Sequence, residues 1–190
     1  MRFFSVLPFI IPALASPTVY FIRHGEKPDD GNGLSITGVD RAQCLRSVFG
    51  ASSGYNIGHI MAMTPKSSRS CPDLICVRRE PGTDTRCTGG SRKRPYETVL
   101  PLAQDLGLDV DTSCDRDDED CVKDVVDDYS GSGNILICWE HKRLSNLAEA
   151  LGAEDVDEYP RDRYDLIWTD PPKYTEITHV TSESCAGLDD

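Results

Sequence analysis

Short apolar runs separated by amphipathic segments follow one another along most of the chain. The clearest run covers residues 134–139, and similar runs cover residues 18–22 and 59–63. Uninterrupted apolar runs of this length are typical of strands that are buried on both faces of a sheet. We expect two final strands at residues 165–169 and 176–180.

Helical periodicity lies between these runs. Thr37 is the expected N-cap of a helix that continues to about Phe49, and Gly50 would end it. Three further helices are expected at residues 95–106, 118–129 and 144–151.

Strands that alternate with helices predict a sheet covered by helices on both faces. We therefore expect an α/β fold, a three-layer α/β/α sandwich with a mostly parallel central sheet. The length of 190 residues favours one domain, which we place at residues 17–190. In such sheets the functional residues gather at the carboxyl ends of the strands.

The first residues have the three parts of a secretory signal peptide. Arg2 supplies a positive charge, residues 3–11 are apolar, and Ala13-Leu14-Ala15 matches the small-x-small cleavage pattern. We expect residues 1–16 to be a signal peptide and the remaining protein to be secreted and extracellular. No apolar stretch is long enough to span a bilayer, so no membrane association is expected after cleavage.

Eight cysteines follow the expected cleavage site, and an even number in an exported chain indicates disulfides. Cys114 and Cys121 flank an acidic loop that they could close. Cys44 and Cys138 fall inside expected elements and favour core thiols. The stretch 64–90 lacks periodicity and predicts an irregular loop, which a bridge could brace through three further cysteines: Cys71, Cys76 and Cys87.

The charge balance restricts the class of ligand. The chain carries 20 Lys and Arg against 32 Asp and Glu, a net charge of −12. An acidic chain disfavours nucleic acid, whose binding depends on a basic surface. If a phosphate group binds, local arginines must overcome this field.

Two histidines directly follow the two clearest strands. His24 comes after the first strand in Arg23-His24-Gly25, and His141 ends the segment Ile135–His141. The carboxyl ends of parallel strands meet at one edge of a sheet, so these imidazoles can face each other. A histidine nucleophile must be neutral, and a phosphoryl group in transit needs arginine donors. The combination favours phosphoryl transfer over acyl transfer.

Together with this pattern, the chain resembles the histidine phosphatase (phosphoglycerate mutase-like) superfamily, which implies a phosphoglycerate mutase-like fold. The matching segments keep the family order from about Val19 to Leu151. They are Arg23-His24-Gly25 after a strand, Leu34-Ser35-Ile36-Thr37-Gly38 followed by Arg41-Ala42-Gln43, Ser91–Thr98, and the strand that delivers His141.

The resemblance implies a phosphatase that acts on a phosphorylated small molecule or another phosphoester. His24 would attack phosphorus and become phosphohistidine, while Arg23, Arg94 and His141 would bind the phosphate. Arg92 and Lys93 are alternatives to Arg94. The chemistry implies no metal ion and no organic cofactor.

The general acid is less clearly indicated. Some members of the family have an aspartate directly after the second histidine, where this chain has Lys142. Glu140 and Glu26 are the candidates, and Glu140 is slightly favoured. Glu97 is a third choice whose position inside a helix suggests a structural role. A carboxylic acid that donates its proton near neutral pH needs a raised pKa, which burial can provide.

Two other functions fit the same pattern. A secreted binding protein could keep the fold without the chemistry. A phosphoglycerate mutase is less consistent with export and small size. The sequence determines neither the natural substrate nor the oligomeric state.

Overall fold

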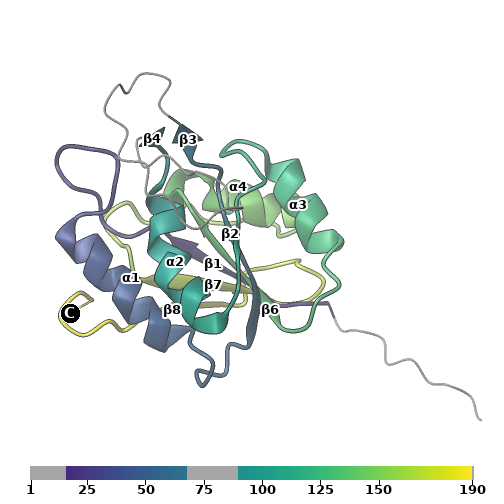
Figure 1. Ribbon diagram of the computed structural model, residues 1–190. Helices are drawn as coiled ribbons and strands as arrows, with labels where there is room; N and C mark the ends of the chain where they lie inside the picture. Colours follow the sequence, from purple (N-terminus) through teal and green to yellow (C-terminus); the bar gives the residue numbers. More distant parts are fainter. Residues whose placement is uncertain (1–15, 68–89, 190) are drawn as a thin grey trace, which may run out of the picture.

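The computed structural model describes residues 16–67 and 90–189. Eight strands lie within these ranges: β1 (Val19–Arg23), β2 (Ile57–Ala62), β3 (Lys66–Ser67), β4 (Gly90–Ser91), β5 (Val110–Asp111), β6 (Asn134–Trp139), β7 (Leu166–Asp170) and β8 (His179–Ser182). Six of them form the central sheet in the order β5-β2-β6-β1-β7-β8 (Figure 1), and β3 pairs with β4 in a separate small sheet.

The centre of the large sheet is parallel. β1 and β2 both run parallel to β6, and β5 runs parallel to β2. β7 is antiparallel to β1, and β8 is antiparallel to β7. The carboxyl ends of β1 and β6 therefore lie side by side, as the sequence predicts.

Helices cover both faces of this sheet (Figure 1). On one face lie α1 (Ile36–Val48) and α2 (Arg94–Leu106), and on the other lie α3 (Glu119–Asp127) and α4 (His141–Leu151). The expected three-layer α/β/α sandwich is confirmed. None of the helices in the described ranges is long and apolar enough to cross a membrane.

Strand β6 shows why its apolar run is continuous. Ile135, Ile137 and Trp139 pack with the α3–α4 layer, whereas Leu136 and Cys138 pack with the α1–α2 layer. Successive side chains of a strand point to opposite faces, and both faces are buried here.

The expected start of the first helix is wrong by two residues. Ser35, not Thr37, is the N-cap of α1, and its hydroxyl oxygen accepts a hydrogen bond of 3.0 Å from the Gly38 amide. Ser and Thr both suit this position, so the residue type alone did not separate them.

Two later elements also begin elsewhere than expected. α4 starts at His141 rather than Leu144, because the chain passes from β6 into the helix through Glu140 alone. The last strand covers His179–Ser182 rather than 176–180, after a turn in which Lys173 and Tyr174 have positive φ angles of 92° and 52°.

The disulfides partly follow the expectation. Cys114 pairs with Cys121 as expected, and Cys138 is a buried free thiol. The expectation for Cys44 is wrong, because Cys44 forms a disulfide with Cys185 and so joins α1 to the C-terminal segment. The other expected bridge and the signal peptide lie outside the described residues.

Candidate active site

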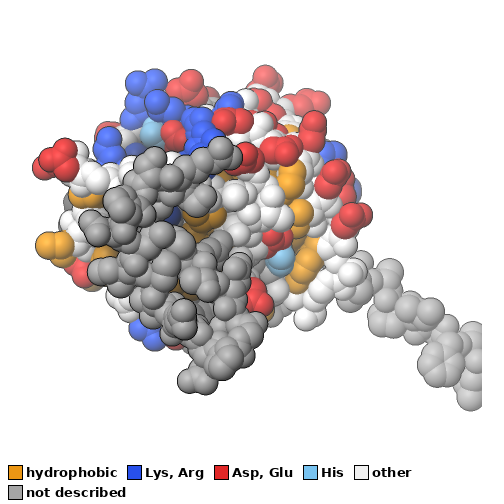
Figure 2. All heavy atoms as spheres, turned by 45° about the horizontal axis from the view of Figure 1, so that its top comes forward, with side chains coloured by type: hydrophobic (Ala, Val, Ile, Leu, Met, Phe, Trp, Pro, Cys, Tyr) orange, Lys and Arg blue, Asp and Glu red, His pale blue; other side chains and the backbone are white. Residues whose placement is uncertain are grey.

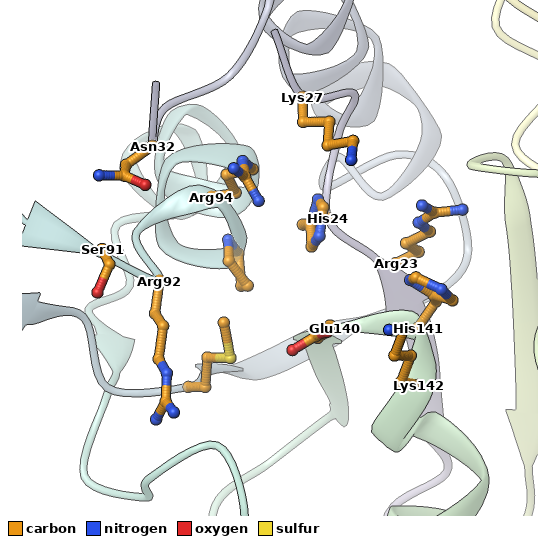
Figure 3. Close-up of a pocket in the computed structure, with 12 residues that line it drawn as sticks. Arg23, His24, Lys27, Asn32, Ser91, Arg92, Arg94, Glu140, His141 and Lys142 are labelled. Carbon is orange, nitrogen blue, oxygen red and sulfur yellow. The ribbon is translucent and has the colours of Figure 1, made fainter. Parts of the chain in front are cut away.

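A cavity of about 350 Å³ lies at the carboxyl ends of β1 and β6. Arg23 and His24 reach it from the end of β1, Glu140 and His141 from the end of β6, and Arg94 from the first turn of α2 (Figure 3). The structure thus brings five of the six predicted site residues together. Other charged or polar residues also line the cavity: Lys27, Asn32, Ser91, Arg92 and Lys142.

His24 is 5% exposed, and one of its ring nitrogens is committed to the backbone. Nδ1 lies 2.7 Å from the carbonyl oxygen of Gly25. A carbonyl only accepts hydrogen bonds, so Nδ1 carries the proton and Nε2 keeps its lone pair.

The surroundings of His24 also keep its ring neutral. Burial is the largest effect and lowers the pKa of His24 to about 4, against the opposing hydrogen bond to Gly25. The positive charges of Arg23 and Arg94 lower it further. The side chain therefore meets both requirements of a histidine nucleophile, a neutral ring and a fixed tautomer.

Backbone hydrogen bonds hold the His24 loop in place. The His24 amide donates to the Trp139 carbonyl oxygen at 3.1 Å, which joins the ends of β1 and β6. The Gly25 amide donates to Thr98 Oγ1 at 2.8 Å, and the Thr98 hydroxyl donates to the Arg94 carbonyl oxygen at 2.8 Å. The nucleophile and the arginine of α2 are thus tied through one threonine, whose role the sequence did not indicate.

Gly25 and Gly38 allow two segments of backbone to pack closely. A Cβ atom on Gly25 would lie 2.9 Å from the Gly38 carbonyl oxygen, and one on Gly38 would lie 2.4 Å from the Glu26 carbonyl oxygen. Side chains are excluded at both positions because the loop after β1 packs directly on the first turn of α1.

His141 is the first residue of α4 and is half-buried. Burial, followed by the charge of Arg23, lowers the pKa of His141 to about 4. Its Nδ1 is buried and has no hydrogen-bond partner among the described residues. The site thus holds a second neutral imidazole with an unused nitrogen.

Arg23 is 4% exposed and is held by neutral groups. Nη1 donates to the carbonyl oxygens of Arg161 and Arg163 at 2.8 and 2.6 Å, and Cζ lies 3.6 Å from the centre of the Tyr164 ring. Burial lowers the pKa of Arg23, and its Nε has no partner within the described part of the chain. The guanidinium is therefore oriented by the protein, but no carboxylate of the described residues is paired with it.

The three basic residues proposed for the second phosphate contact are separated by the structure. Arg94 lines the cavity while its Nε and Nη2 donate to the carbonyl oxygens of Gly33 and Gly31 at 3.1 and 3.3 Å. Arg92 also lines the cavity. Lys93 does not line it and pairs with Glu97 at 2.9 Å.

The carboxylate candidates are separated as well. Glu140 lines the cavity and pairs with Arg116. Glu26, the other predicted general acid, does not reach the cavity, because its carboxylate receives hydrogen bonds from Arg41, the shortest of which is 2.7 Å. Glu97 is likewise outside the cavity.

Arg116 belongs to the acidic stretch 115–120, which the Cys114–Cys121 disulfide closes. Its carbonyl oxygen accepts a hydrogen bond of 3.0 Å from the Trp139 indole nitrogen. Asp117 in the same stretch pairs with Arg143 of α4. The stretch therefore packs against the end of β6 and positions Glu140.

Arg41 is the centre of a second buried charge cluster. It is 1% exposed and pairs with Glu26 at 2.7 Å, Glu183 at 2.6 Å and Asp189 at 2.8 Å. Glu183 and Asp189 also lie near Cys185, but the Cys185 sulfur is in a disulfide and offers no thiolate to a metal ion.

The cavity has the opposite charge to the whole chain. Among the described residues, one carboxylate (Glu140) lines it, together with five cationic side chains: Arg23, Lys27, Arg92, Arg94 and Lys142. Figure 2 shows Lys and Arg side chains gathered in one area of a surface with many acidic groups. Forked, positively charged donors beside a neutral imidazole suit the binding of an oxyanion such as phosphate.

Several solved structures are similar to this chain, and two of them are described here. The protein histidine phosphatase SixA in complex with tungstate has a TM-score of 0.58 and 12% identity, covering 87% of this chain and 97% of that chain. The protein assigned as phosphohistidine phosphatase SixA from Agrobacterium tumefaciens has a TM-score of 0.54 and 12% identity, covering 88% and 98%. No protein-family model and no curated protein matches the sequence.

The similarity shows that the chain has the same fold as these SixA histidine phosphatase structures. This confirms the fold that the sequence motifs imply.

Proposed function

We propose that the protein is a secreted phosphatase that hydrolyses phosphate monoesters through a phosphohistidine intermediate on His24. The observation that carries this proposal is the hydrogen bond from His24 Nδ1 to Gly25, which leaves the lone pair of Nε2 free in a cationic cavity. The phosphatases named among the similar structures support the same class of reaction.

In the first step, the phosphate oxygens bind Arg23, Arg94 and the neutral His141. The lone pair of His24 Nε2 forms the N–P bond while the ester P–O bond breaks. The oxygen of the leaving group takes a proton from Glu140, the one carboxyl group that lines the cavity among the described residues. This step uses the state in which Glu140 is protonated and released from Arg116.

In the second step, water attacks phosphorus and transfers a proton to Glu140. The N–P bond breaks, its electron pair returns to Nε2, and inorganic phosphate is released. Each group ends the cycle in its starting state.

Two features support the further parts of the proposal. The bridges Cys44–Cys185 and Cys114–Cys121 suit an oxidising compartment, in agreement with the signal peptide expected at residues 1–16. The cationic lining of the cavity disfavours a divalent metal ion by like-charge repulsion, which supports metal-independent chemistry.

The test uses the chain from Ser16 onward, produced in an oxidising host. Hydrolysis of p-nitrophenyl phosphate is measured from acidic to neutral pH with EDTA present. His24→Ala should lower the rate by at least about 10³-fold while circular dichroism shows an unchanged fold. Rapid quenching at alkaline pH and mass spectrometry should find phosphate on His24 of the wild type. A folded wild-type protein without activity or trapped phosphate would instead favour a binding protein.

Glu140→Gln tests the proton donor separately. It should slow an alkyl phosphate, whose leaving group needs a proton, more than p-nitrophenyl phosphate, whose leaving group departs as an anion. Glu26→Gln should leave the ratio of the two rates unchanged. If Glu140→Gln also leaves it unchanged, the proton comes from another group.

A further inference from the structure

A second hollow, larger than the catalytic cavity, lies over β7 and β8. This groove has a volume of about 640 Å³ and is bounded by the segment that follows α4. Val180 of β8, which is 55% exposed, contributes apolar surface, and the largely buried Leu166 and Trp168 of β7 lie at the base of the groove. The rest of its lining is mainly acidic: Glu154, Asp155, Asp157, Glu158 and Glu176.

The charges of this groove are not balanced by the protein. None of the residues that line it among the described ranges is Lys, Arg or His. None of its five carboxylates forms an ion pair with a described residue, whereas Asp117 and Glu140 near the catalytic cavity are paired. An occupant with positive charges would supply the missing complement.

The neighbouring strand favours an extended occupant. β8 is at the edge of the sheet, where β7 is its one partner strand within the described part of the chain, and all four residues of β8 are exposed. An unpaired strand edge can hydrogen-bond to an added polypeptide strand, and the apolar floor can take its side chains.

A third hollow adjoins both the groove and the catalytic cavity. A smaller hollow of about 200 Å³ shares His141 and Lys142 with the catalytic cavity and Glu158 with the groove. The segment that follows α4 and bounds the groove continues to Arg161 and Arg163, whose carbonyl oxygens accept hydrogen bonds from Arg23.

The order of the strands gives the approximate distance between the catalytic cavity and the groove. β8 lies three strand positions from β6, which is about 14 Å at the usual strand spacing. About four residues of extended polypeptide span that distance.

We propose that this acidic groove is a docking site for a cationic, extended segment of a phosphorylated polypeptide substrate. The phosphorylated residue enters the catalytic cavity, and basic and apolar residues about four positions away lie in the groove. The substrate part of this inference rests on the proposed phosphatase function, whereas the docking of the basic segment does not.

The test compares two phosphopeptides that differ at positions about four residues from the phosphorylated residue. One carries Arg-Leu-Arg there, and the other carries Gly-Ser-Gly. The wild type should show a kcat/KM at least about tenfold higher for the basic peptide. The double variant Asp157→Lys with Glu176→Lys should remove this preference and leave hydrolysis of p-nitrophenyl phosphate unchanged.

A matched control carries the same change of charge elsewhere. Asp124→Lys with Asp128→Lys alters two exposed acidic residues outside the groove, in and just after α3, and should keep the peptide preference. Equal kcat/KM for both peptides with wild-type protein that hydrolyses p-nitrophenyl phosphate would overturn the docking proposal alone.

Absence of p-nitrophenyl phosphate hydrolysis would instead count against the phosphatase function. Docking is then measured by fluorescence anisotropy with the unphosphorylated basic peptide. Binding by the wild type and the control variant, but not by the groove variant, supports the docking site. Equal binding by all three, or by none, overturns it.

Discussion

Arg23 and Arg41 are both almost fully buried, with 4% and 1% of their surface exposed, yet their surroundings are opposite. Arg41 is paired with three carboxylates, those of Glu26, Glu183 and Asp189. Arg23 is held by two carbonyl oxygens and the face of Tyr164.

Removing a guanidinium from water is costly unless other groups compensate its charge. Burial opposes the charge of Arg41, but its hydrogen bonds to Glu26, Asp189 and Glu183 outweigh burial and raise its pKa. Burial prevails at Arg23 and lowers its pKa. The compensation of Arg41 is therefore internal and structural, whereas that of Arg23 is left for an anionic ligand.

The largest effect is expected from Arg41→Ala. Removing one partner of a buried ion pair leaves charges uncompensated and should reduce the free energy of unfolding by about 3–5 kcal/mol. Urea unfolding followed by circular dichroism measures this. Arg46→Ala is the control, because Arg46 pairs with Asp105 at the exposed surface and its loss should reduce the free energy of unfolding much less than the loss of Arg41. Similar losses in both variants would contradict the structural role of Arg41.

Arg23→Ala should reduce activity more than stability, the opposite of Arg41→Ala. It should lower kcat/KM for p-nitrophenyl phosphate by about 10²–10³-fold, because a positioned donor to the transferred phosphoryl group is lost. The midpoint of urea unfolding should fall less than in Arg41→Ala, because the variant loses two hydrogen bonds to carbonyl oxygens and the contact with Tyr164 but breaks no ion pair of the described residues. A variant that keeps full activity, or that unfolds as readily as Arg41→Ala, would remove the distinction between the two arginines.

The pH dependence of kcat/KM tests how Arg23 affects its neighbour His24. The acid limb of kcat/KM should lie near pH 4, the lowered pKa of His24, rather than near the ordinary value of 6.5. Arg23 contributes to this lowering, so the residual activity of Arg23→Ala should have its acid limb at higher pH. A limb near 6.5 in the wild type would show that His24 is not the buried, neutral group described above.

The lowered pKa values of the two histidines also make the stability of the fold depend on pH. The pKa values of His24 and His141 are lowered to about 4, so the unfolded chain binds more protons than the folded one between pH 4 and 6.5, and stability falls as the pH decreases through this window.

The smallest effect is expected from Thr98→Val, which removes the hydroxyl that joins Gly25 to Arg94. Loss of these two hydrogen bonds should cost about 1–2 kcal/mol, and a slightly displaced His24 should lower kcat/KM by no more than about tenfold. Steady-state kinetics and thermal unfolding measure both. Thr98→Ser, which keeps the hydroxyl, should restore the activity.

The sequence predicts which side chains lie at the cavity well where a residue adjoins a regular element. His24 and His141 come directly after continuous apolar strands, and Arg94 begins a periodic helix, so pattern and motif together place them. The choice between Glu26 and Glu140 could not be made from the sequence. It depends on two ion pairs. Arg41 holds the Glu26 carboxylate away from the cavity, and Arg116 pairs with Glu140 at the cavity.

Contacts between segments that are far apart in the chain could not be predicted from the sequence either. Cys44 and Cys185 are separated by 141 residues, and an even number of cysteines does not reveal which two meet. Tyr164, which supports Arg23, lies in a loop without periodicity. The last strand begins a few residues later than expected. Lys and Tyr are not typical of positive φ angles, so the sequence did not indicate the turn at Lys173 and Tyr174 that precedes this strand.

The contrast between a net charge of −12 and a cationic cavity bears on diffusional encounter. A phosphate dianion that approaches from bulk solvent first meets a repelling field and is attracted only within a short distance of the cavity. Added electrolyte screens interactions beyond about 10 Å at 0.1 M ionic strength but weakens direct contacts less. Moderate salinity should therefore speed the capture of small anionic substrates, the reverse of the usual behaviour of an enzyme that attracts its substrate from afar.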